Sequence, residues 1–530
     1  MGVVRLLFFL IFLSATVAFA SDRSYLFDQK LLNWLRQNVS PETGMPLSFG
    51  TAVPEKEALS HIGKPSSITG IIERTIVQDG ISVYDAALWQ IVLAYTGRTD
   101  DLLMAQKPDQ YYWKGSLGEL TDIRTGSGRQ IFIYDPRDPE AVTLDRLRPG
   151  QRGFLFRILN AHGQYLAPDP LDGKQEFKGF PNSSYLHWED WKPIAGENAW
   201  VVMAALHVLE REAPQGKVDT DSDVFRLAEE LARAALVLQA DNGGIRMAPL
   251  GTYYHLIDID PALSSEKIAE KLDEIAHKVH LAAAQPAGGE QDVGALFPDY
   301  HRWYYEEIST ENNFSWYAAF RMLWKITGEE KYRRAMSRIE DYLHSAWDEK
   351  NGVFFQGMHF RDGAWKPNDE LFATDVQNWA VAILGPRVLD EWFGAGAARR
   401  IWEQTKKMSG VLDPEGKILG VGFSSEHNRL SVEWTAGAIL AVRRLREYYE
   451  NLDGSYSREL DEEEHIMRRG VDAFRYRLSG GREAYSYSSR RDWIPFGWFS
   501  HNKEILSVAS TAWVALIDAG VDPFQLTEDQ

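Results

Sequence analysis

Five acidic residues in this sequence each open a short segment that is rich in alanine and aromatic residues. They are Asp85, Glu197, Glu311, Asp375 and Glu433. Acid/base chemistry on a glycosidic bond needs two carboxyl groups: one protonates the leaving oxygen, and the other acts on the anomeric carbon or activates water. A carboxylate at a helix start also caps free N–H groups and is favoured by the helix dipole, so each acid has a purely structural explanation as well.

Glu311 is the candidate for the general acid. Its neighbours along the chain include Tyr304, Tyr305, Phe314 and Trp316. An apolar setting disfavours the ionised form of a carboxyl group and raises its pKa towards neutrality. A carboxyl group that stays protonated near pH 7 can donate its proton to a leaving group.

The second catalytic carboxylate is less sharply defined by the sequence. Asp375 or Glu433 would act as the base, and Asp85 is a further catalytic candidate. Glu306 and Glu307, just upstream of the presumed acid, are alternatives for the acid itself. If several helix starts face one mouth, two of these carboxyl groups can lie at the separation that glycoside hydrolysis requires.

Aromatic and polar residues in loops form the predicted substrate-binding set. The flat faces of sugar rings stack on aromatic side chains, whereas sugar hydroxyls need carboxylates, amides or guanidinium groups. Residues 187–192 and 485–493 combine both kinds of side chain, and tryptophans inside apolar helices are expected to belong mostly to the core. The binding candidates are Glu197, Asn312, Asn313, Trp188, Trp191, His427, Arg490, Trp493 and Trp498.

The elements that position these residues are predicted to be helices of two kinds. The segments that carry the acids have small and aromatic residues on every face, which is typical of helices buried on all sides. Amphipathic segments with one charged face alternate with them and are expected to form an outer layer. The predicted amphipathic helices span 24–37, 223–239, 264–284, 330–346, 388–407 and 461–478.

Two insertions interrupt this alternation. Residues 107–185 are rich in Gly, Pro and Asp and contain strand-like runs at 130–134 and 153–159, and residues 240–304 carry a further helix and loops. We interpret both as additions over the mouth of one domain that spans 21–530.

The segment STENN at 309–313, followed by SWYAA at 315–319, is similar to the strongest motif of uncharacterised bacterial members of the six-hairpin glycosidase superfamily. GENAW at 196–200, TDVQNW at 374–379 and VEWTAG at 432–437 support this resemblance. It implies an all-α fold, an (α/α)6 toroid of helical hairpins with small β-like insertions. It says little about substrate, because related toroids carry polysaccharide lyases and sugar epimerases as well.

The resemblance and the paired acids together favour a glycoside hydrolase that cleaves a neutral oligo- or polysaccharide without cofactor or metal. One alternative is a lyase or a sugar epimerase that uses His427 or a loop tyrosine to move a proton. Another is a non-catalytic glycan-binding or scaffold protein. Oligomeric state, sugar and linkage are left open.

Composition and the N-terminus bear on partners and location. The formal net charge of -19 argues against a nucleic-acid partner, and the absence of cysteine excludes disulfides and thiolate sites. Arg5, the apolar stretch 6–17 and Ala18-Phe19-Ala20 form a secretion signal over residues 1–20. The protein is therefore expected to be exported, periplasmic or secreted, with no stable membrane insertion after cleavage.

Overall fold

The structure is a computed structural model of the chain, and α-helices dominate it, as the all-α prediction requires. The described residues are 23–62, 68–116, 153–160, 193–213, 217–249, 264, 266–271, 273–274, 303–425 and 428–527.

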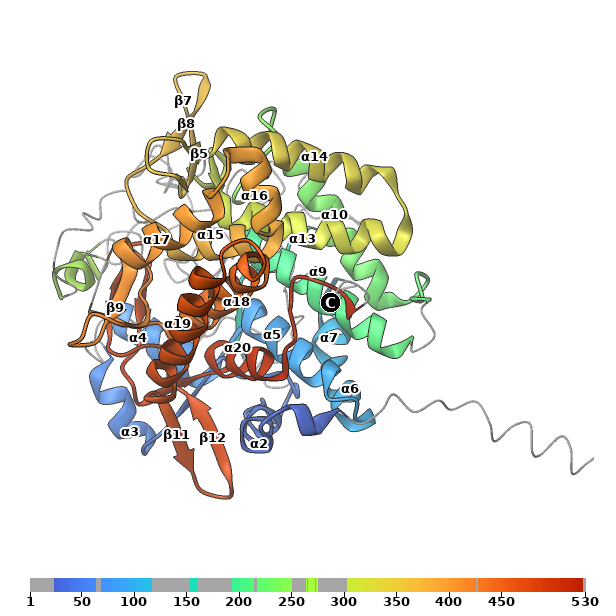
Figure 1. Cartoon of the computed structure of the whole chain (residues 1–530). Helices are drawn as coiled ribbons and strands as arrows, with labels where there is room; N and C mark the ends of the chain where they lie inside the picture. The colour runs from blue at the N-terminus through green and yellow to red at the C-terminus, as the bar shows by residue number, and fades with distance from the viewer. Residues whose placement is uncertain are drawn as a thin grey trace, which may run out of the picture.

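Six helices form a closed inner ring (Figure 1). Each contacts the next one along the chain, and the last contacts the first. Nearly every residue along most of their lengths is buried, which is what small and aromatic side chains on all faces predict. The ring consists of α5 (Val83–Tyr95), α9 (Ala195–Glu212), α13 (Thr310–Thr327), α15 (Thr374–Trp379) with its π-helical continuation η5 (Ala380–Leu384), α18 (Val432–Tyr449) and α20 (Val508–Ala519).

An outer layer of amphipathic helices covers the ring. Each of its six members packs against an inner helix: α2 on α20, α6 on α5, α10 on α9, α14 on α13, α17 on α15 and α19 on α18. This is the predicted (α/α)6 toroid. The outer elements are α2 (Gln29–Gln37), α6 (Thr99–Ala105) with α7 (Lys107–Ser116), α10 (Asp223–Leu238), α14 (Glu330–Ser345), α16 (Pro386–Phe393) with α17 (Ala397–Ser409), and α19 (Gly454–Asp472).

The outer helices differ from the sequence-based prediction in several places, among them residues 475–478 of the helix predicted over 461–478, which form a strand. The helix expected over 388–407 is broken into α16 and α17 because Gly394 and Gly396 have φ values of 87° and 79°, which no continuous helix allows. Helix α19 starts earlier than predicted, where the Asp453 side chain accepts hydrogen bonds from the N–H groups of Ser455 and Tyr456. The outer position between α5 and α9 belongs to α6 and α7, although the sequence assigned residues from Lys107 onwards to an insertion.

Short strands and helical turns join the long helices, and many lie where an inner helix begins. Strands β2, β4 and β15 run directly into α5, α13 and α20. The strand-like run predicted at 153–159 is a strand only from Ile158 onwards, and it pairs with β2. The strands are β1 (Phe49–Thr51), β2 (Gly80–Ser82), β3 (Ile158–Asn160), β4 (Glu307–Ser309), β5 (Trp347–Asp348), β6 (Val353–Phe354), β7 (Gly357–Arg361), β8 (Ala364–Asn368), β9 (Gly410–Leu412), β10 (Ile418–Val421), β11 (Arg475–Leu478), β12 (Arg482–Tyr485), β13 (Asp492–Ile494), β14 (Trp498–Ser500) and β15 (Ile505–Ser507). The shorter helices are η1 (Ser24–Leu26), α3 (Glu55–Ala58), η2 (Leu59–His61), α4 (Ile68–Asp79) and η4 (Trp303–Tyr305).

In the described part of the chain, the strands pair antiparallel in seven small sheets. β4, β7 and β8 form the three-stranded one, and the two-stranded pairs are β1–β15, β2–β3, β5–β6, β9–β10, β11–β12 and β13–β14. The β1–β15 pair, which aligns Phe49 with Ser507, joins the first part of the chain to the last inner helix.

A repeated polar contact fixes the approach to four of the inner helices. In each of these four helices, the fourth residue after the capping residue carries an amide or hydroxyl side chain. This side chain forms hydrogen bonds with both the N–H and the C=O of one residue in an incoming segment. Both backbone groups of that residue are therefore satisfied on the side that faces the helix. These pairs are Asn198 with Leu155, Asn313 with Ile245, Gln377 with Phe354, and Thr435 with Val421.

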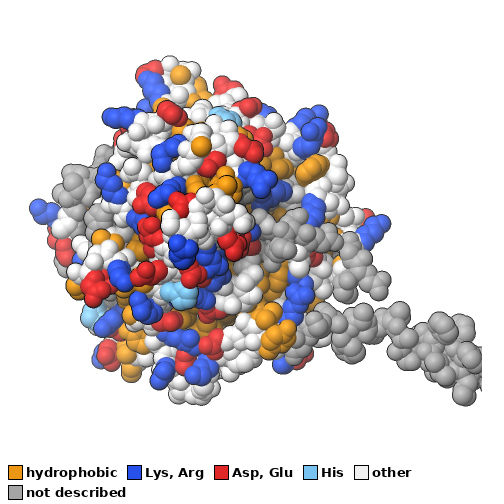
Figure 2. Space-filling model, in the orientation of Figure 1, with side chains coloured by type: hydrophobic (Ala, Val, Ile, Leu, Met, Phe, Trp, Pro, Cys, Tyr) orange, Lys and Arg blue, Asp and Glu red, His pale blue; other side chains and the backbone are white. Residues whose placement is uncertain are grey.

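The outer surface carries both signs of charge. On the face in Figure 2, Lys and Arg side chains lie among Asp and Glu side chains, and neither sign covers a continuous area. Among the described residues, the helices are all too short or too polar to cross a membrane.

Candidate active site

A cavity of about 350 Å³ opens at the N-terminal ends of the inner helices. All five acids singled out in the sequence line it, and two further carboxylates from the preceding segments join them. Helix starts from around the ring meet here, so the predicted convergence on one mouth is what the fold produces. The seven acidic side chains are Glu73, Asp85, Glu197, Glu307, Glu311, Asp375 and Glu433.

The five acids at the helix starts occupy two different positions. Glu311, Asp375 and Glu433 are the second residue after the capping residue of their helices, whereas Asp85 and Glu197 are the third. Successive helical residues point about 100° apart. The two groups therefore reach the cavity from different directions, although the sequence segments look alike.

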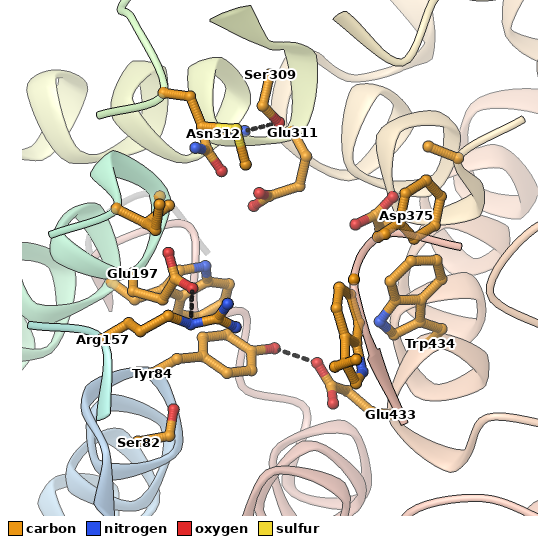
Figure 3. A pocket seen from close by; sticks show the side chains of 18 of the residues that line it. Ser82, Tyr84, Arg157, Glu197, Ser309, Glu311, Asn312, Asp375, Glu433 and Trp434 are labelled. Atoms are coloured by element: carbon orange, nitrogen blue, oxygen red, sulfur yellow. Dashed lines mark hydrogen bonds and ion pairs between the residues drawn. The ribbon is translucent and has the colours of Figure 1, made fainter. Parts of the chain in front are cut away.

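Glu311 and Asp375 both reach the cavity, from the adjacent helices α13 and α15 (Figure 3). Burial raises the pKa of Glu311 well above its ordinary value, and the negative charge of Asp375 raises it further. The Ser315 hydroxyl donates to Glu311 Oε1 at 3.0 Å. Burial raises the pKa of Asp375 to about 7, against the lowering effect of the Val376 N–H, which donates to its carboxylate at 2.8 Å. Two coupled carboxyl groups with different surroundings are suited to hold one proton between them.

Glu433 and Asp85 form the second pair of buried carboxyl groups, each 7% exposed. Burial raises the pKa of Glu433 to about 8 and that of Asp85 to about 7. The Tyr84 hydroxyl donates to Glu433 Oε1 at 2.6 Å, and hydrogen bonds from Ser48 and Ser82 oppose the raised pKa of Asp85. The positive charge of Arg157 also opposes the rise in the pKa of Asp85.

Of the remaining three carboxylates, Glu197 and Glu73 are each paired with an arginine, and Glu307 contacts a histidine. Glu197 lies 3.2 Å from Arg157 Nε, and Glu307 is in direct contact with His359. Glu73 accepts two hydrogen bonds from one arginine, Arg491, at 2.9 and 2.6 Å, and this pairing outweighs burial and lowers the pKa of Glu73 to about 2. The two arginine pairs are structural ion pairs, whereas burial raises the pKa of Glu307 to about 7.

Aromatic side chains supply most of the apolar wall. Trp498, predicted as a binding residue, lines the cavity, and its Nε1 donates to the Tyr487 hydroxyl at 3.0 Å. Trp200 and Trp379 were expected in the core; they are buried and also line the cavity. The aromatic lining residues are Phe49, Tyr84, Trp200, Tyr304, Trp379, Trp434, Tyr487, Phe496, Trp498 and Phe499.

Asn312 is a buried lining residue of the cavity. Its side chain is 3% exposed, and its Nδ2 has no hydrogen-bond partner among the described residues. A Cβ on Gly196 would lie 2.1 Å from Asn312 Oδ1, so only glycine at this position leaves the amide where it is. The buried Nε1 of Trp200, another lining residue, is also without a partner in the described part of the chain.

Three predicted binding residues do not line the cavity. Asn313 is fully buried and holds the backbone of Ile245. Trp493 packs against Phe499 in the β13–β14 hairpin, and Arg490 bonds Asn428 and Asp492 beside it. The sequence shows the chemistry of a side chain but not its direction, which is why these three were chosen. Trp188, Trp191, His427, the run at 130–134 and the signal at 1–20 lie outside the described residues.

Several lining residues were not selected from the sequence. Tyr84 stands directly before Asp85 and occupies the same helical position as Glu311. Its place beside a candidate acid could therefore have identified it from the sequence. Trp434 stands directly after Glu433 and could have been identified for the same reason. Glu73 and Arg157 belong to segments with no distinguishing motif, and only the folded chain brings them to the cavity.

No protein-family model and no curated protein sequence matches this chain. Solved structures do match. A sugar epimerase from a ruminal bacterium is similar over 95% of this chain and 99% of its own, with 10% identity and a TM-score of 0.51. The cellobiose 2-epimerase of Bacillus thermoamylovorans B4167 is similar over 92% of this chain and 96% of its own, with 10% identity and a TM-score of 0.50. The GH76A alpha-1,6-mannanase of Salegentibacter sp. HEL1_6 covers 94% of this chain and 98% of its own, with 11% identity and a TM-score of 0.45.

The similarity to the two epimerase structures and the closed ring of hairpins show that this protein has the (α/α)6 toroid fold. This is the fold expected from the six-hairpin glycosidase resemblance. At these identities the likeness establishes the fold. The reaction has to be argued from the cavity itself.

Proposed function

We propose that this protein is a glycoside hydrolase that uses two carboxyl groups and acts on an oligo- or polysaccharide. The observation that carries the proposal is that Glu311 and Asp375, from adjacent helices, line one aromatic-walled cavity and lie close enough for the charge of Asp375 to act on Glu311. Their pKa values are both raised, and that of Glu311 is raised further by the charge of Asp375. Such a pair carries one proton at neutral pH, which is the state that acid/base hydrolysis begins from.

In this mechanism Glu311 protonates the leaving glycosidic oxygen. Asp375 either attacks the anomeric carbon directly or activates a water molecule that attacks it. Asp375 is the better base because its carboxylate accepts a backbone hydrogen bond, which favours the ionised form. Glu433 is the alternative base. Its role is less favoured because one oxygen is already bound by Tyr84.

Epimerisation and lyase chemistry are the competing mechanisms on this fold. A sugar epimerase that works through histidines would need them at the reacting carbon. Among the described residues, His501 is the histidine that lines the cavity, and its Nδ1 lies 3.4 Å from Glu73. The side chains that remain for proton transfer in the cavity are carboxyl groups, and this supports hydrolysis.

The test is turnover of a glycan panel of varied linkage by the protein from Ser21 onwards, with reducing ends and the ultraviolet absorbance of unsaturated uronate read together. Hydrolysis produces reducing ends without that absorbance. Glu311→Gln and Asp375→Asn should each lower kcat by about 10²–10⁴-fold. The matched control is Glu447→Gln, which removes a carboxylate that is 63% exposed on the same chain.

Each other outcome points elsewhere. Reducing ends that absorb in the ultraviolet indicate a lyase. Conversion of a free reducing sugar into its isomer without bond cleavage indicates an epimerase. Glycan binding without any product indicates a scaffold.

We also propose that the protein is exported through its N-terminal segment. The support is the charged start, apolar core and small-residue cleavage pattern of residues 1–20. Expression of the full chain followed by cell fractionation and N-terminal sequencing should yield a product that starts at Ser21 outside the cytoplasm. A cytoplasmic product that retains Met1 contradicts the proposal.

A further inference from the structure

The C-terminal segment, residues 521–527, folds back into the toroid at the end opposite the cavity and reaches α9 (Figure 1). Gly520, with a φ of 68°, ends α20 and lets the chain reverse its direction. The Phe524 side chain then packs between the inner helices, where it is fully buried. The described end of the chain therefore fills the axis of the ring.

Side chains from the inner helices hold this segment in place. The anchors come from separate helices, so the segment cannot shift along the axis of the ring without the loss of several buried hydrogen bonds at once. The contacts are His207 of α9 with the Pro523 C=O at 2.9 Å, Glu210 of α9 with the Thr527 N–H at 2.9 Å, Arg321 of α13 with the Phe524 C=O at 3.1 Å, and Arg444 of α18 with the Asp522 carboxylate at 2.6 Å.

Three tryptophans surround the Phe524 ring. The distances between ring centroids are 5.2 Å to Trp200, 5.4 Å to Trp379 and 6.0 Å to Trp513. Each tryptophan is the sixth residue of its inner helix, and their helices, α9, α15 and α20, are every second one of the ring. The sixth residues of the other three inner helices are smaller, which leaves the indoles room to meet near the axis: they are Leu88, Ser315 and Gly437.

Two of these tryptophans belong to the cavity as well. Trp200 and Trp379 line it, with their ring centroids 5.5 Å apart, whereas Phe524 does not line it. The cavity opens at the N-terminal ends of the inner helices, and Phe524 enters from the other end. The two indoles therefore separate the cavity from Phe524 and form what we call the floor of the cavity.

Packing orients this floor. The Trp200 Nε1 has no hydrogen-bond partner in the described part of the chain, so the position of its ring depends on the rings beside it. In a close-packed interior, neighbouring side chains move into the space that a deleted ring leaves, although only in part. Loss of the Phe524 ring would thus displace the floor away from the cavity.

We propose that Phe524 is a positioning residue for substrate binding, which holds Trp200 and Trp379 as the floor against which the bound sugar lies. The proposal rests on the proposed function, because the ligand is the sugar substrate. Phe524 itself neither touches the sugar nor takes part in proton transfer. Its effect is on the shape of the cavity and hence on affinity.

The first test is fluorine NMR of the protein labelled with fluorotryptophan. The signals of Trp200 and Trp379 are assigned by their loss in Trp200→Phe and Trp379→Phe. Phe524→Ala should shift or broaden both signals and leave that of Trp402, on the outer helix α17, unchanged. If both signals stay as in the wild type, the proposal is overturned.

Phe320→Ala is the matched control. Phe320 is also fully buried, but it packs against Trp316 and Tyr332, and none of the three lines the cavity. Both variants delete a buried ring and should lower the Tm. Equal changes in the Trp200 and Trp379 signals in the two variants would show a general loosening of the core and overturn the proposal.

The second test is the kinetics on a glycan that the wild type hydrolyses. Phe524→Ala should raise KM about 2–10-fold, the range expected for a lost aromatic contact, and change kcat by less than about two-fold. Phe320→Ala should leave KM unchanged. If Phe524→Ala does not fold, Phe524→Leu takes its place, since leucine is apolar but has no ring.

The two proposals fail separately. Hydrolysis with a KM that Phe524→Ala leaves unchanged rejects the floor and keeps the hydrolase. If the wild type hydrolyses no glycan, the hydrolase is rejected, and the glycan panel is added to the labelled protein instead. A change in the Trp200 and Trp379 signals that is weaker in Phe524→Ala then supports the floor, and signals that no glycan changes overturn it.

Discussion

The Tyr84 hydroxyl donates a hydrogen bond of 2.6 Å to the carboxylate of Glu433, a residue 349 positions later in the chain. Tyr84 begins the first inner helix and Glu433 the fifth, and α20 lies between them in the ring. Trp513 of α20 completes the link, because its Nε1 donates to the same hydroxyl at 2.8 Å. The Glu433 carboxyl group therefore depends on the contact between Tyr84 and Trp513, which joins the first hairpin of the toroid to the last.

Replacing Tyr84 by phenylalanine should loosen this contact. The Trp513 N–H loses its acceptor, and an unsatisfied buried donor costs about 1–3 kcal/mol, measured as the free energy of unfolding in denaturant. The pKa of Glu433 should rise, because the Tyr84 hydroxyl stabilises its ionised form.

Tyr485→Phe is the matched control for Tyr84→Phe. It removes a hydroxyl that donates to Asp472 at 2.8 Å outside the cavity. Both variants should lose stability, and only Tyr84→Phe should change substrate binding or the pH profile of turnover. Equal effects of both variants on turnover would contradict the link to the cavity.

Gly196→Ala should act through Asn312. The added methyl group would lie 2.1 Å from Asn312 Oδ1, so the amide must turn away. We expect a KM for the substrate about ten-fold higher than that of the wild type, from the loss of one hydrogen bond of about 1–1.5 kcal/mol.

A double-mutant cycle checks the route of this effect. Asn312→Ala alone should raise KM to a similar extent, and Gly196→Ala should add little on top of it. Additive effects of the two substitutions would show that Gly196 matters for some other reason.

Stability should fall between pH 4 and pH 8. The ordinary pKa values are 3.8 for Asp85 and Asp375 and 4.5 for Glu433, and burial raises them to about 7, 7 and 8. Over this interval the folded protein keeps protons that the unfolded chain has released, so a rise in pH favours unfolding. The contribution is fully present below pH 4 and is lost as pH passes 7 to 8.

The measurement is the free energy of unfolding or the Tm at several pH values. Asp85→Asn removes one titrating group, so it should flatten the decline and be relatively more stable at pH 8 than at pH 5. Glu447→Gln is the control, since it removes a carboxylate that is 63% exposed at the surface. The assigned pKa values would be contradicted if the wild-type protein were more stable at pH 8 than at pH 5 and Asp85→Asn had the same pH dependence of stability as the wild type.

Asn313→Ala tests the contact that holds an incoming segment to an inner helix. The side chain accepts from the Ile245 N–H at 2.7 Å and donates to the Ile245 C=O at 3.1 Å. Its loss leaves two buried backbone groups unsatisfied, and we expect about 2–4 kcal/mol of destabilisation in denaturant unfolding. Asn351→Ala, at an exposed turn, should change stability by less than about 0.5 kcal/mol. A loss of that small size in Asn313→Ala would show that the segment is held by other contacts.

Much of the fold could be predicted because helix type is a local property. Segments such as 83–95, with small and aromatic residues on all faces, can be buried only as inner helices, and one-sided segments such as 223–238 must cover them. The breaks were harder to predict. The split at Gly394 depends on two backbone conformations within a run whose apolar spacing continues across it.

The candidate site was predicted in part for a similar reason. Glu311 and Asp375 could be found because acids at buried helix starts are conspicuous, and a ring directs such starts to one end. Asn313 was chosen for its amide, yet one residue along a helix turns the side chain by about 100°, from the cavity wall to the backbone of Ile245. Glu73 had no signal at all, because its place depends on Arg491.

The linear sequence by itself specified the alternation of buried and amphipathic helices and the acids at their starts, since both follow from side-chain chemistry within a few residues. The tertiary structure alone determined which carboxyl groups gained a cation and which did not. Arg157 reaches Glu197 and Arg491 reaches Glu73 across long stretches of chain, while Glu433 receives only a tyrosine hydroxyl. The pKa values of the cavity carboxyl groups are set by these distant pairings, because the electrostatic energy of a buried group depends on its neighbours in space.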